Sequence, residues 1–393
     1  MLRRDDTGRV MTAALVCALS IAGCLGGASA LGQHSVSHRV KSSAAVKGRH
    51  RPAQPQPSKS SADGLFKKRG PYQEQGRTIW EYVLTVAEQE HKLADGTPYK
   101  VWAFGGSIPA PTLIAREGDW VRLRLVNETS VPHTIHSHGL FVPQRMDGVP
   151  PSHGTAHHGA NAAGKSAQPV EPGESFTYEY IARPAGTHFY HCHFNTNEHL
   201  NRGMAGALII LPRVPEPEVD KDIVMLLQEW NSRFARGGQL GGPREMYDSD
   251  FFTINGHSFP ATEPVRAEVG EVIRLRFINA GAQPHFMHLH GHSFLVTHKD
   301  GAPMAEPLEM DTVAVGPGER VDIVFVANNP GEWPLHCHAA AHQSNAGIYP
   351  GGMMTHVFVG KLDSPAEGEG PVGPGVEQLR ATWRHSALRH LRK

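Results

Sequence analysis

The chain has little charge and little cysteine for its length. Only 19% of its 393 residues are charged, and 38 Lys and Arg balance 38 Asp and Glu, so the formal net charge is zero. Such a balance offers no basic field to a nucleic acid and argues against that class of partner. Four cysteines in a chain of this length do not make a disulfide scaffold. The length allows two or three domains, each with its own core.

The N-terminal apolar run is too short to span a bilayer. Basic residues precede this run at 10–21, and small residues follow it, which predicts a signal peptide over 1–30 and an exported protein (extracellular, periplasmic or in the cell envelope). Ala28-Ser29-Ala30 fits an ordinary cleavage site, whereas the residues ending in Cys24 resemble a lipobox and would make a lipoprotein. The pair Arg3-Arg4 leaves twin-arginine export open as well.

Glycine, proline and histidine are abundant instead. The 42 Gly and 30 Pro favour turn-rich β structure, and the 26 His need an explanation of their own. Residues 31–70 are rich in Ser, Pro, Gln and basic side chains, which predicts a disordered basic spacer with possible cell-wall or membrane association. We therefore expect the ordered protein to begin near residue 71.

From that point the sequence repeats itself. Gly118 in a Glu-Gly-Asp turn returns as Gly270 in a Val-Gly-Glu turn, 152 positions later, and the strand-like residues 121–127 return as 273–279. Alternating apolar residues and regular turns predict an all-β fold. The repeat therefore predicts two tandem Greek-key β-sandwich or barrel domains, at 71–213 and 219–361.

Residues 362–393 differ in character from the two copies. A Gly, Pro and Glu linker leads into 376–393, where Leu379, Trp383, Ala387 and Leu391 recur every four residues. This spacing predicts a basic amphipathic helix. Two interpretations remain open: packing on its own domain or a neighbouring subunit, and docking on a membrane surface.

Each copy carries a His-Cys-His triplet and an earlier His-x-His-Gly motif. Alternate side chains of a strand share a face, so the two histidines of the triplet point one way and the cysteine points the other. A thiolate with two imidazoles and a weak axial thioether is the ligand set of a blue copper site and suits copper better than zinc. The first copy supplies His133, Cys192, His199 and Met204; the second supplies His285, Cys337, His342 and Met353.

We expect both cysteines to stay unpaired as copper ligands. Met354 stands beside Met353, which leaves open a second site without a working axial ligand. Four further histidines remain in each copy, too few for a multinuclear copper cluster, whereas eight would complete one trinuclear centre between the two kinds of domain. These eight are His136, His138, His191, His193, His288, His290, His336 and His338.

The chain resembles the multicopper oxidase family on these motifs, in particular its two-domain, laccase-like members with a type 1 copper motif in both cupredoxin domains. The resemblance covers roughly residues 75–361. It implies two type 1 coppers, one type 2 copper on His136 and His288, and a type 3 pair on the other six histidines. It also implies a homotrimer and oxidation of a small reducing substrate by dioxygen.

Asp147 stands nine residues after His138, in Met-Asp-Gly-Val-Pro. Such a sequence is often only a turn. Since reduction of dioxygen to water consumes protons, a carboxylate near the type 2 copper is also a candidate proton relay, as similarly placed acids are in the family.

Other functions remain open at this point. Phenols, aryl amines and reduced metal ions are all candidate donors. A two-domain copper nitrite reductase resembles this plan, but its single catalytic copper is held by three imidazoles and does not need His-Cys-His in both copies. A copper-binding or electron-transfer protein without catalysis needs no eight-histidine set. His153, His157 and His158 fit either a solvated loop or a secondary metal-capture site.

Overall fold

A computed structural model describes residues 64–150, 169–235, 248–360, 370–373 and 375–391. The signal peptide, residues 31–63 of the spacer, Cys24 and the loop histidines His153, His157 and His158 lie outside these ranges. The predicted linker at 362–369 lies outside them as well.

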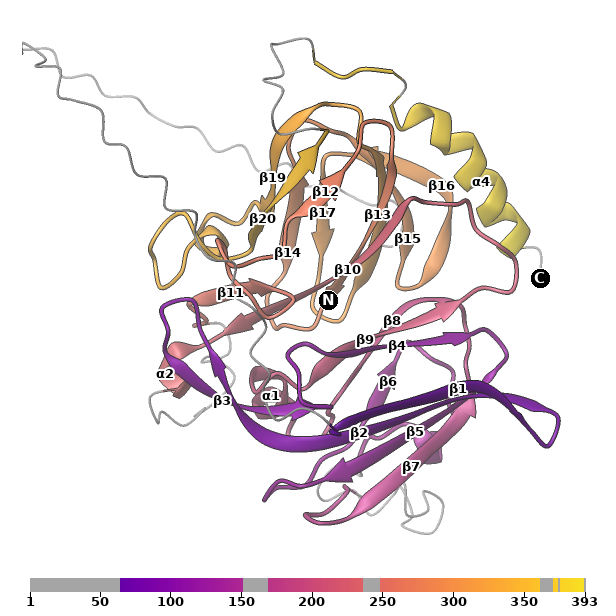
Figure 1. Cartoon of the computed structure of the whole chain (residues 1–393), viewed down its shortest axis with the longest axis vertical. Helices are drawn as coiled ribbons and strands as arrows, with labels where there is room; N and C mark the ends of the chain where they lie inside the picture. The colour runs from indigo at the N-terminus through magenta and orange to yellow at the C-terminus, as the bar shows by residue number, and fades with distance from the viewer. Residues whose placement is uncertain (1–63, 151–168, 236–247, 361–369, 374, 392–393) are drawn as a thin grey trace, which may run out of the picture. The chain divides into compact units, whose positions relative to one another are not determined.

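The first domain is a sandwich of two sheets (Figure 1). One sheet has the order β1-β2-β5-β7 with β3 paired to β2, and the other has the order β4-β9-β8-β6. The first strand begins at Phe66, so order starts before the predicted end of the spacer at residue 70. The elements are β1 (Phe66–Glu74), β2 (Arg77–Lys92), β3 (Pro98–Phe104), β4 (Ala110–Arg116), β5 (Trp120–Asn127), β6 (His136–His138), η1 (Gln144–Met146), β7 (Ser175–Ile181), β8 (Gly186–His191), α1 (Thr196–Asn201) and β9 (Ala205–Leu211).

The second domain repeats this plan, which confirms the predicted all-β architecture. Its sheets have the orders β11-β10-β13-β18-β15-β16 and β12-β20-β19-β14-β17. The elements are β10 (Lys221–Trp230), α2 (Ser232–Ala235), β11 (Phe251–Ile254), β12 (Val265–Ala267), β13 (Val272–Asn279), β14 (His285–Leu289), β15 (Phe294–Lys299), β16 (Ala302–Met310), β17 (Thr312–Val315), β18 (Arg320–Val326), β19 (Gly331–Cys337), η3 (Ala340–Gln343) and β20 (Met354–Val359).

The register of two parallel strand pairs aligns the copies residue by residue. In the first copy Val86 of β2 lies opposite Asn127 of β5, and in the second Leu227 of β10 lies opposite Asn279 of β13. The two asparagines also make equivalent bonds, because each side-chain amide donates to two backbone carbonyl groups at 2.8 Å. Equivalent positions can therefore be compared directly between the domains.

Strands β5 and β13 show where the copies differ. In β5 the apolar side chains face the core, while Arg124 on the other face is exposed. In β13 the equivalent Arg276 is 4% exposed, because this face of the sheet contacts β8 of the first domain. Arg276 bonds there to Thr187 at 2.7 Å and to the buried carboxylate of Asp322 at 3.0 Å. A buried charge network thus joins the two domains.

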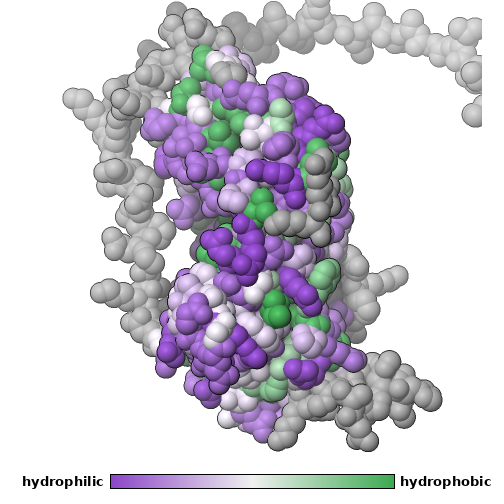
Figure 2. Space-filling view, turned by 90° about the vertical axis from the view of Figure 1, so that its right-hand side faces the viewer, coloured by the Kyte–Doolittle hydropathy of each residue, from purple (hydrophilic) through white to green (hydrophobic). Residues whose placement is uncertain are grey.

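The C-terminal helix α4 (Glu377–Leu391) packs on β16 of its own domain (Figure 1). Trp383 and Ala387 are buried, and Arg380 and Arg384 each lie 2.7 Å from a glutamate of β16. The face of the molecule that carries this helix is largely hydrophilic, with apolar residues in small groups (Figure 2). These contacts favour packing on the helix's own domain. Within the described ranges, no helix combines the length and apolar character needed to cross a bilayer.

The interdomain charge network generates a prediction for stability. Replacement Arg276→Leu should lower the free energy of unfolding by about 3–5 kcal/mol, because it leaves the buried Asp322 without its guanidinium partner. The matched replacement Arg124→Leu, on the exposed face of β5, should change it by no more than about 0.5 kcal/mol. Urea unfolding of both copper-free variants measures the difference, and equal losses would contradict the proposed role of the network.

Candidate metal centres

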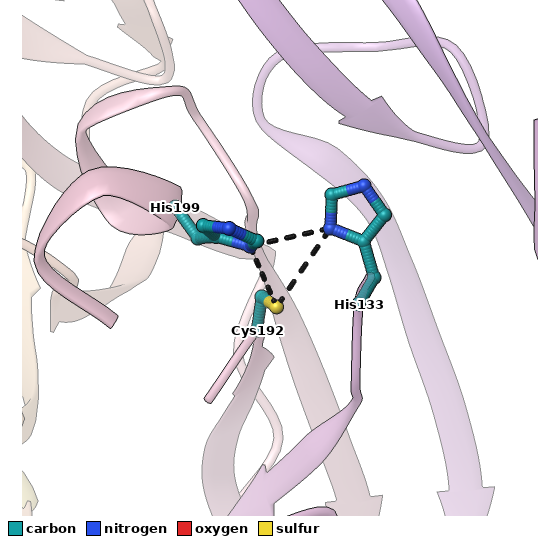
Figure 3. A group of neighbouring side chains, drawn as sticks. All are labelled: His133, Cys192 and His199. Carbon is teal, nitrogen blue, oxygen red and sulfur yellow. Dashed lines mark hydrogen bonds between the residues drawn. The ribbon is translucent and has the colours of Figure 1, made fainter. Parts of the chain in front are cut away.

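The first cysteine site brings together three side chains from separate elements (Figure 3). Cys192 follows β8, His199 lies in α1, and His133 lies in the segment before β6. The Cys192 Sγ atom is 3.1 Å from Nδ1 of His199 and 4.0 Å from Nδ1 of His133, and the two Nδ1 atoms are 3.2 Å apart. All three residues are buried. The two imidazoles thus present the same type of nitrogen to one thiol.

The second copy reproduces this geometry with His285, Cys337 and His342. The Cys337 Sγ atom is 3.4 Å from Nδ1 of His342 and 4.0 Å from Nδ1 of His285, and the two Nδ1 atoms are 3.1 Å apart. All three residues are again buried. Both cysteines are free, as expected from the sequence.

Each predicted axial methionine lies beside its cysteine. The backbone N–H of Cys192 donates to the carbonyl of Met204 at 3.2 Å, and that of Cys337 donates to the carbonyl of Met353 at 2.9 Å. Both methionines are fully buried. The structure therefore places the four predicted ligands of each copy in one part of the core.

Burial controls the protonation of these groups. It lowers the pKa of His133 and of His285 to about 3, assisted by the second imidazole of each site, and it raises the pKa of Cys192 to about 11. The metal-free sites therefore hold neutral imidazoles and a protonated thiol. A soft sulfur ligand with two neutral imidazoles fits copper, whose binding would displace the thiol proton.

A second cluster in the first copy comes from β6, β8 and the residue after Cys192. His136 lies with its ring centroid 5.6 Å from His138, 5.2 Å from His191 and 5.4 Å from His193. Ligand nitrogens of the first three lie within 4.8 Å of one another. The structure therefore groups the four histidines that the sequence singled out in this copy.

The second copy groups its four histidines in the same way. The ring of His288 lies 4.6 Å from His290, 5.7 Å from His336 and 5.7 Å from His338. The Nε2 atoms of His290 and His336 are 3.0 Å apart. His338 is exposed, so this cluster is open to solvent.

Backbone carbonyl groups fix which nitrogen these imidazoles present. Nδ1 of His136 lies 2.8 Å from the carbonyl oxygen of Asp147, and Nδ1 of His191 lies 3.0 Å from that of Cys192. With Nδ1 donating to a carbonyl, Nε2 is left as the ligand atom. His288 and His336 make the equivalent bonds to Asp311 and Cys337. The four histidines with these bonds thus present Nε2 to the cluster, whereas the histidines of the cysteine sites present Nδ1 to the thiol.

Asp147 lies against its cluster, and a second aspartate does so in the other copy. Asp147 Oδ1 is 3.2 Å from His136 Nδ1, and Asp311 Oδ1 is 3.9 Å from His288 Nδ1. Sequence reasoning missed Asp311. Its signal was the Met-Asp pair after each His-x-His-Gly motif, with different spacing in the two copies.

Sequence reasoning also missed Glu229, a buried carboxyl group near His285. Burial raises its pKa to about 7, while backbone N–H groups of Gln283 and Ala282 act in the opposite direction. In the sequence, Glu229 is marked by being a charged residue within a strand of mostly apolar residues.

One chain does not bring the eight cluster histidines together. Every ring contact among them joins two members of the same copy, and in the ranges that the structure describes none joins the copies. The two clusters of a chain are therefore separate, and each four-histidine cluster is called a half-site.

Comparisons with known proteins cover both domains. Two family models, both described as multicopper oxidase, match residues 85–215 and 238–360. Laccase-24 of Oryza sativa subsp. japonica is 34% identical over 244 residues, or 58% of this chain and 40% of that protein. The copper-containing nitrite reductase of Neisseria gonorrhoeae is 25% identical over 277 residues, or 67% of this chain and 65% of that protein. The chain thus spans less than two thirds of the length of either relative.

A solved structure agrees with the architecture as well. The blue copper oxidase from Nitrosomonas europaea superposes with a TM-score of 0.65 at 40% sequence identity, over 71% of this chain and 85% of that chain.

The lowered histidine pKa values predict acid sensitivity of the copper-free protein. Below the ordinary pKa of 6.5 the unfolded chain binds protons that the folded chain does not, so stability present above this pH is lost as the pH falls toward about 3. His133→Gln should reduce this slope by up to about 1.4 kcal/mol per pH unit. Urea unfolding between about pH 6.5 and 5 measures the slope.

The exposed His385 of helix α4 provides the control for this experiment. His385→Gln should keep the wild-type slope. Glu229 contributes with the opposite sign between its ordinary pKa of 4.5 and about 7, and this contribution is common to all three proteins. Equal slopes for wild type and His133→Gln would contradict the assignment.

Proposed function

The chain belongs to the multicopper oxidase family and is an oxidoreductase that uses copper, and from this premise we propose that it is a laccase-like oxidase. It oxidises four equivalents of a small one-electron donor, a phenol, aryl amine or reduced metal ion, and reduces dioxygen to water. The observation that carries this proposal is the duplicated juxtaposition of a buried thiol site with a four-imidazole half-site. Copper, when bound, supplies the one-electron chemistry and the site of dioxygen reduction.

The protein's contribution begins with the His-Cys-His triplets. Cys192 is covalently joined to His191 and His193, so the buried thiol and the imidazoles of the neighbouring half-site are separated by only a few bonds. Cys337 holds the same position between His336 and His338. The backbone thereby couples the site where electrons enter to the site where they are used.

Burial limits how far the proposed ligands of each cysteine site can move when metal binds. The thiols and imidazoles of both cysteine sites are held by packing and excluded from water, so their geometry is preorganised for metal. Water must still reach the half-sites, and His338 and the partly exposed His136 lie where it can. Asp147 and Asp311 lie beside these half-sites and would hold and deliver the protons that dioxygen reduction consumes.

The separation of the half-sites supports assembly as a homotrimer, with each eight-histidine centre completed by the first domain of one chain and the second domain of the next. Phe141 and Val149 near the first half-site are exposed, as are Phe286 and Met310 near the second. Exposed apolar residues beside incomplete sites fit a protein interface. For localisation we propose export through the predicted signal, with lipidation at Cys24 as the alternative.

The similarity to a copper nitrite reductase supports a second candidate function. In this chain both copies retain a complete His-Cys-His triplet and four cluster histidines, which a three-imidazole catalytic site does not need. The oxidase is therefore the better supported of the two.

Copper content separates the candidates. We expect about five copper ions per fully loaded chain, two at the cysteine sites and three as one chain's share of the histidine centre. Metal analysis with electron paramagnetic resonance measures this number. A content near two, with no oxygen uptake in the presence of a good donor, would contradict the oxidase proposal.

The aspartates generate a kinetic prediction. Asp147→Asn should keep the blue absorption of the cysteine sites but slow reoxidation of the reduced enzyme by dioxygen about 10–100-fold. Asp311→Asn should have a smaller effect, because its carboxylate lies further from the cluster imidazole. Stopped-flow absorbance measures both rates.

Asp95 is the matched control for this measurement, since it is an exposed turn residue whose carboxylate accepts hydrogen bonds only from Thr97 among the described residues. Asp95→Asn should reoxidise at the wild-type rate. An unchanged rate in Asp147→Asn would remove the relay from the mechanism.

A further inference from the structure

The two cysteine sites have the same predicted ligands but differ in the group that lies beside Nε2 of His133 or His285. This is the outer nitrogen of each ring, since Nδ1, the inner nitrogen, faces the thiol. In the first copy this group is a hydroxyl. Thr129 Oγ1 lies 2.7 Å from Nε2 of His133, and both residues are buried. The hydroxyl also bonds to Asn127 Oδ1 at 2.8 Å and to the Val131 carbonyl at 3.0 Å.

The second copy has the same turn without the hydroxyl. Gly281 takes the position of Thr129, and its N–H donates to Asn279 Oδ1 at 2.9 Å, as the N–H of Thr129 donates to Asn127. A Cβ atom at Gly281 would overlap the carboxylate of Glu229. Glu229 from β10 therefore occupies the space that a side chain at position 281 would need.

Glu229 is firmly held in this space. It is 4% exposed, and its carboxylate accepts the N–H of Gln283 at 2.5 Å and the N–H of Ala282 at 3.2 Å. Its Oε1 atom lies 3.9 Å from Nε2 of His285. That Nε2 atom is buried and has no hydrogen-bond partner among the described residues. Glu229 is thus the carboxyl group that faces it.

The first copy has a glutamate at the equivalent strand position, but its carboxylate lies near the surface and not beside a histidine of the cysteine site. The strand register aligns Glu88 of β2 with Glu229 of β10, since they pair with Trp102 and Phe252 respectively. The rings of these partners lie 4.7 Å and 4.1 Å from the second histidine of each site. Glu88 instead pairs with Lys100 at 2.7 Å near the surface. The two copies therefore differ in where an equivalent carboxylate is directed.

At 3.9 Å the Glu229 carboxylate acts on Nε2 of His285 through its negative charge, whereas the Thr129 hydroxyl makes a hydrogen bond of 2.7 Å to Nε2 of His133. Negative charge beside a ligand imidazole favours Cu(II) over Cu(I), because it stabilises the more positive ion. On the proposed assignment of copper to both sites, we propose that Glu229 is a positioning residue that gives the Cys337 site a lower reduction potential than the Cys192 site. The chain then has two inequivalent electron entry points. The Cys192 site accepts electrons from weaker donors, and the Cys337 site passes electrons on with the greater driving force.

The test begins with single-site proteins that keep Glu229. Copper-loaded Cys337→Ser retains only the first blue site, and Cys192→Ser retains only the second. Anaerobic titration of each in graded mixtures of ferrocyanide and ferricyanide, followed by the blue absorption, gives the two midpoint potentials. We expect the lower midpoint in Cys192→Ser. A midpoint equal to or above that of Cys337→Ser would overturn the proposal.

Substitution of the carboxyl group then tests the cause. Glu229→Gln in the Cys192→Ser protein should raise the midpoint, while the matched Glu88→Gln in the same protein should leave it unchanged. A fully loaded, blue Glu229→Gln protein with an unshifted midpoint, or an equal shift in Glu88→Gln, would overturn the role of Glu229.

Failure of the proposed function gives a different result. A wild-type chain that holds blue copper at only one of its two cysteines contradicts the two-site assignment and, with it, this inference. Two blue sites with equal midpoints leave the proposed function intact and contradict only the inference.

Discussion

The two-residue alternation of the extended backbone at the ends of β8 and β19 is the constraint on which both kinds of site depend. In each copy it directs one cysteine into the core between two histidines that point to the opposite face. The thiol thereby meets two buried imidazoles, while its neighbours join a half-open histidine cluster.

Burial imposes the second requirement, which is neutrality. Imidazoles in the core lose the solvation that would stabilise their protonated form, so they remain available as ligands. In the clusters, backbone carbonyls accept from Nδ1 of His136 and His288 and leave Nε2 facing the other imidazoles. The two kinds of site thus present different nitrogens of the same residue type.

Duplication preserved the positions of these predicted ligands, whereas their surroundings diverged. The outer face of β5 meets solvent, but the equivalent face of β13 meets the first domain, so Arg124 is exposed where Arg276 is part of a buried network. A similar divergence directs Glu88 to a surface lysine and Glu229 toward His285. Two sites with the same predicted ligands therefore lie in different electrostatic environments.

Local spacing was enough to predict the all-β fold, the two copies and the ligand candidates, because strand periodicity and repeat register are properties of neighbouring residues. The unpaired state of Cys192 and Cys337 followed from the same reasoning. The start of order was placed too late, since a basic, polar segment still forms the strand that begins at Phe66 by pairing with β2. Composition alone does not reveal such a pairing.

The candidate ligand sets were thus determined by the sequence itself, as residues at fixed short spacings on a strand and the turn that follows it. Only the tertiary structure decided what lies behind each ligand. Asp311 and Glu229 reach their histidines from elements distant in the chain, and helix α4 found its partner in β16 through contacts that its own spacing does not specify. The separation of the two half-sites also emerged only in three dimensions. The physical reason is that these features depend on how strands pack across sheets and domains, and such packing is set by the whole core rather than by any one segment.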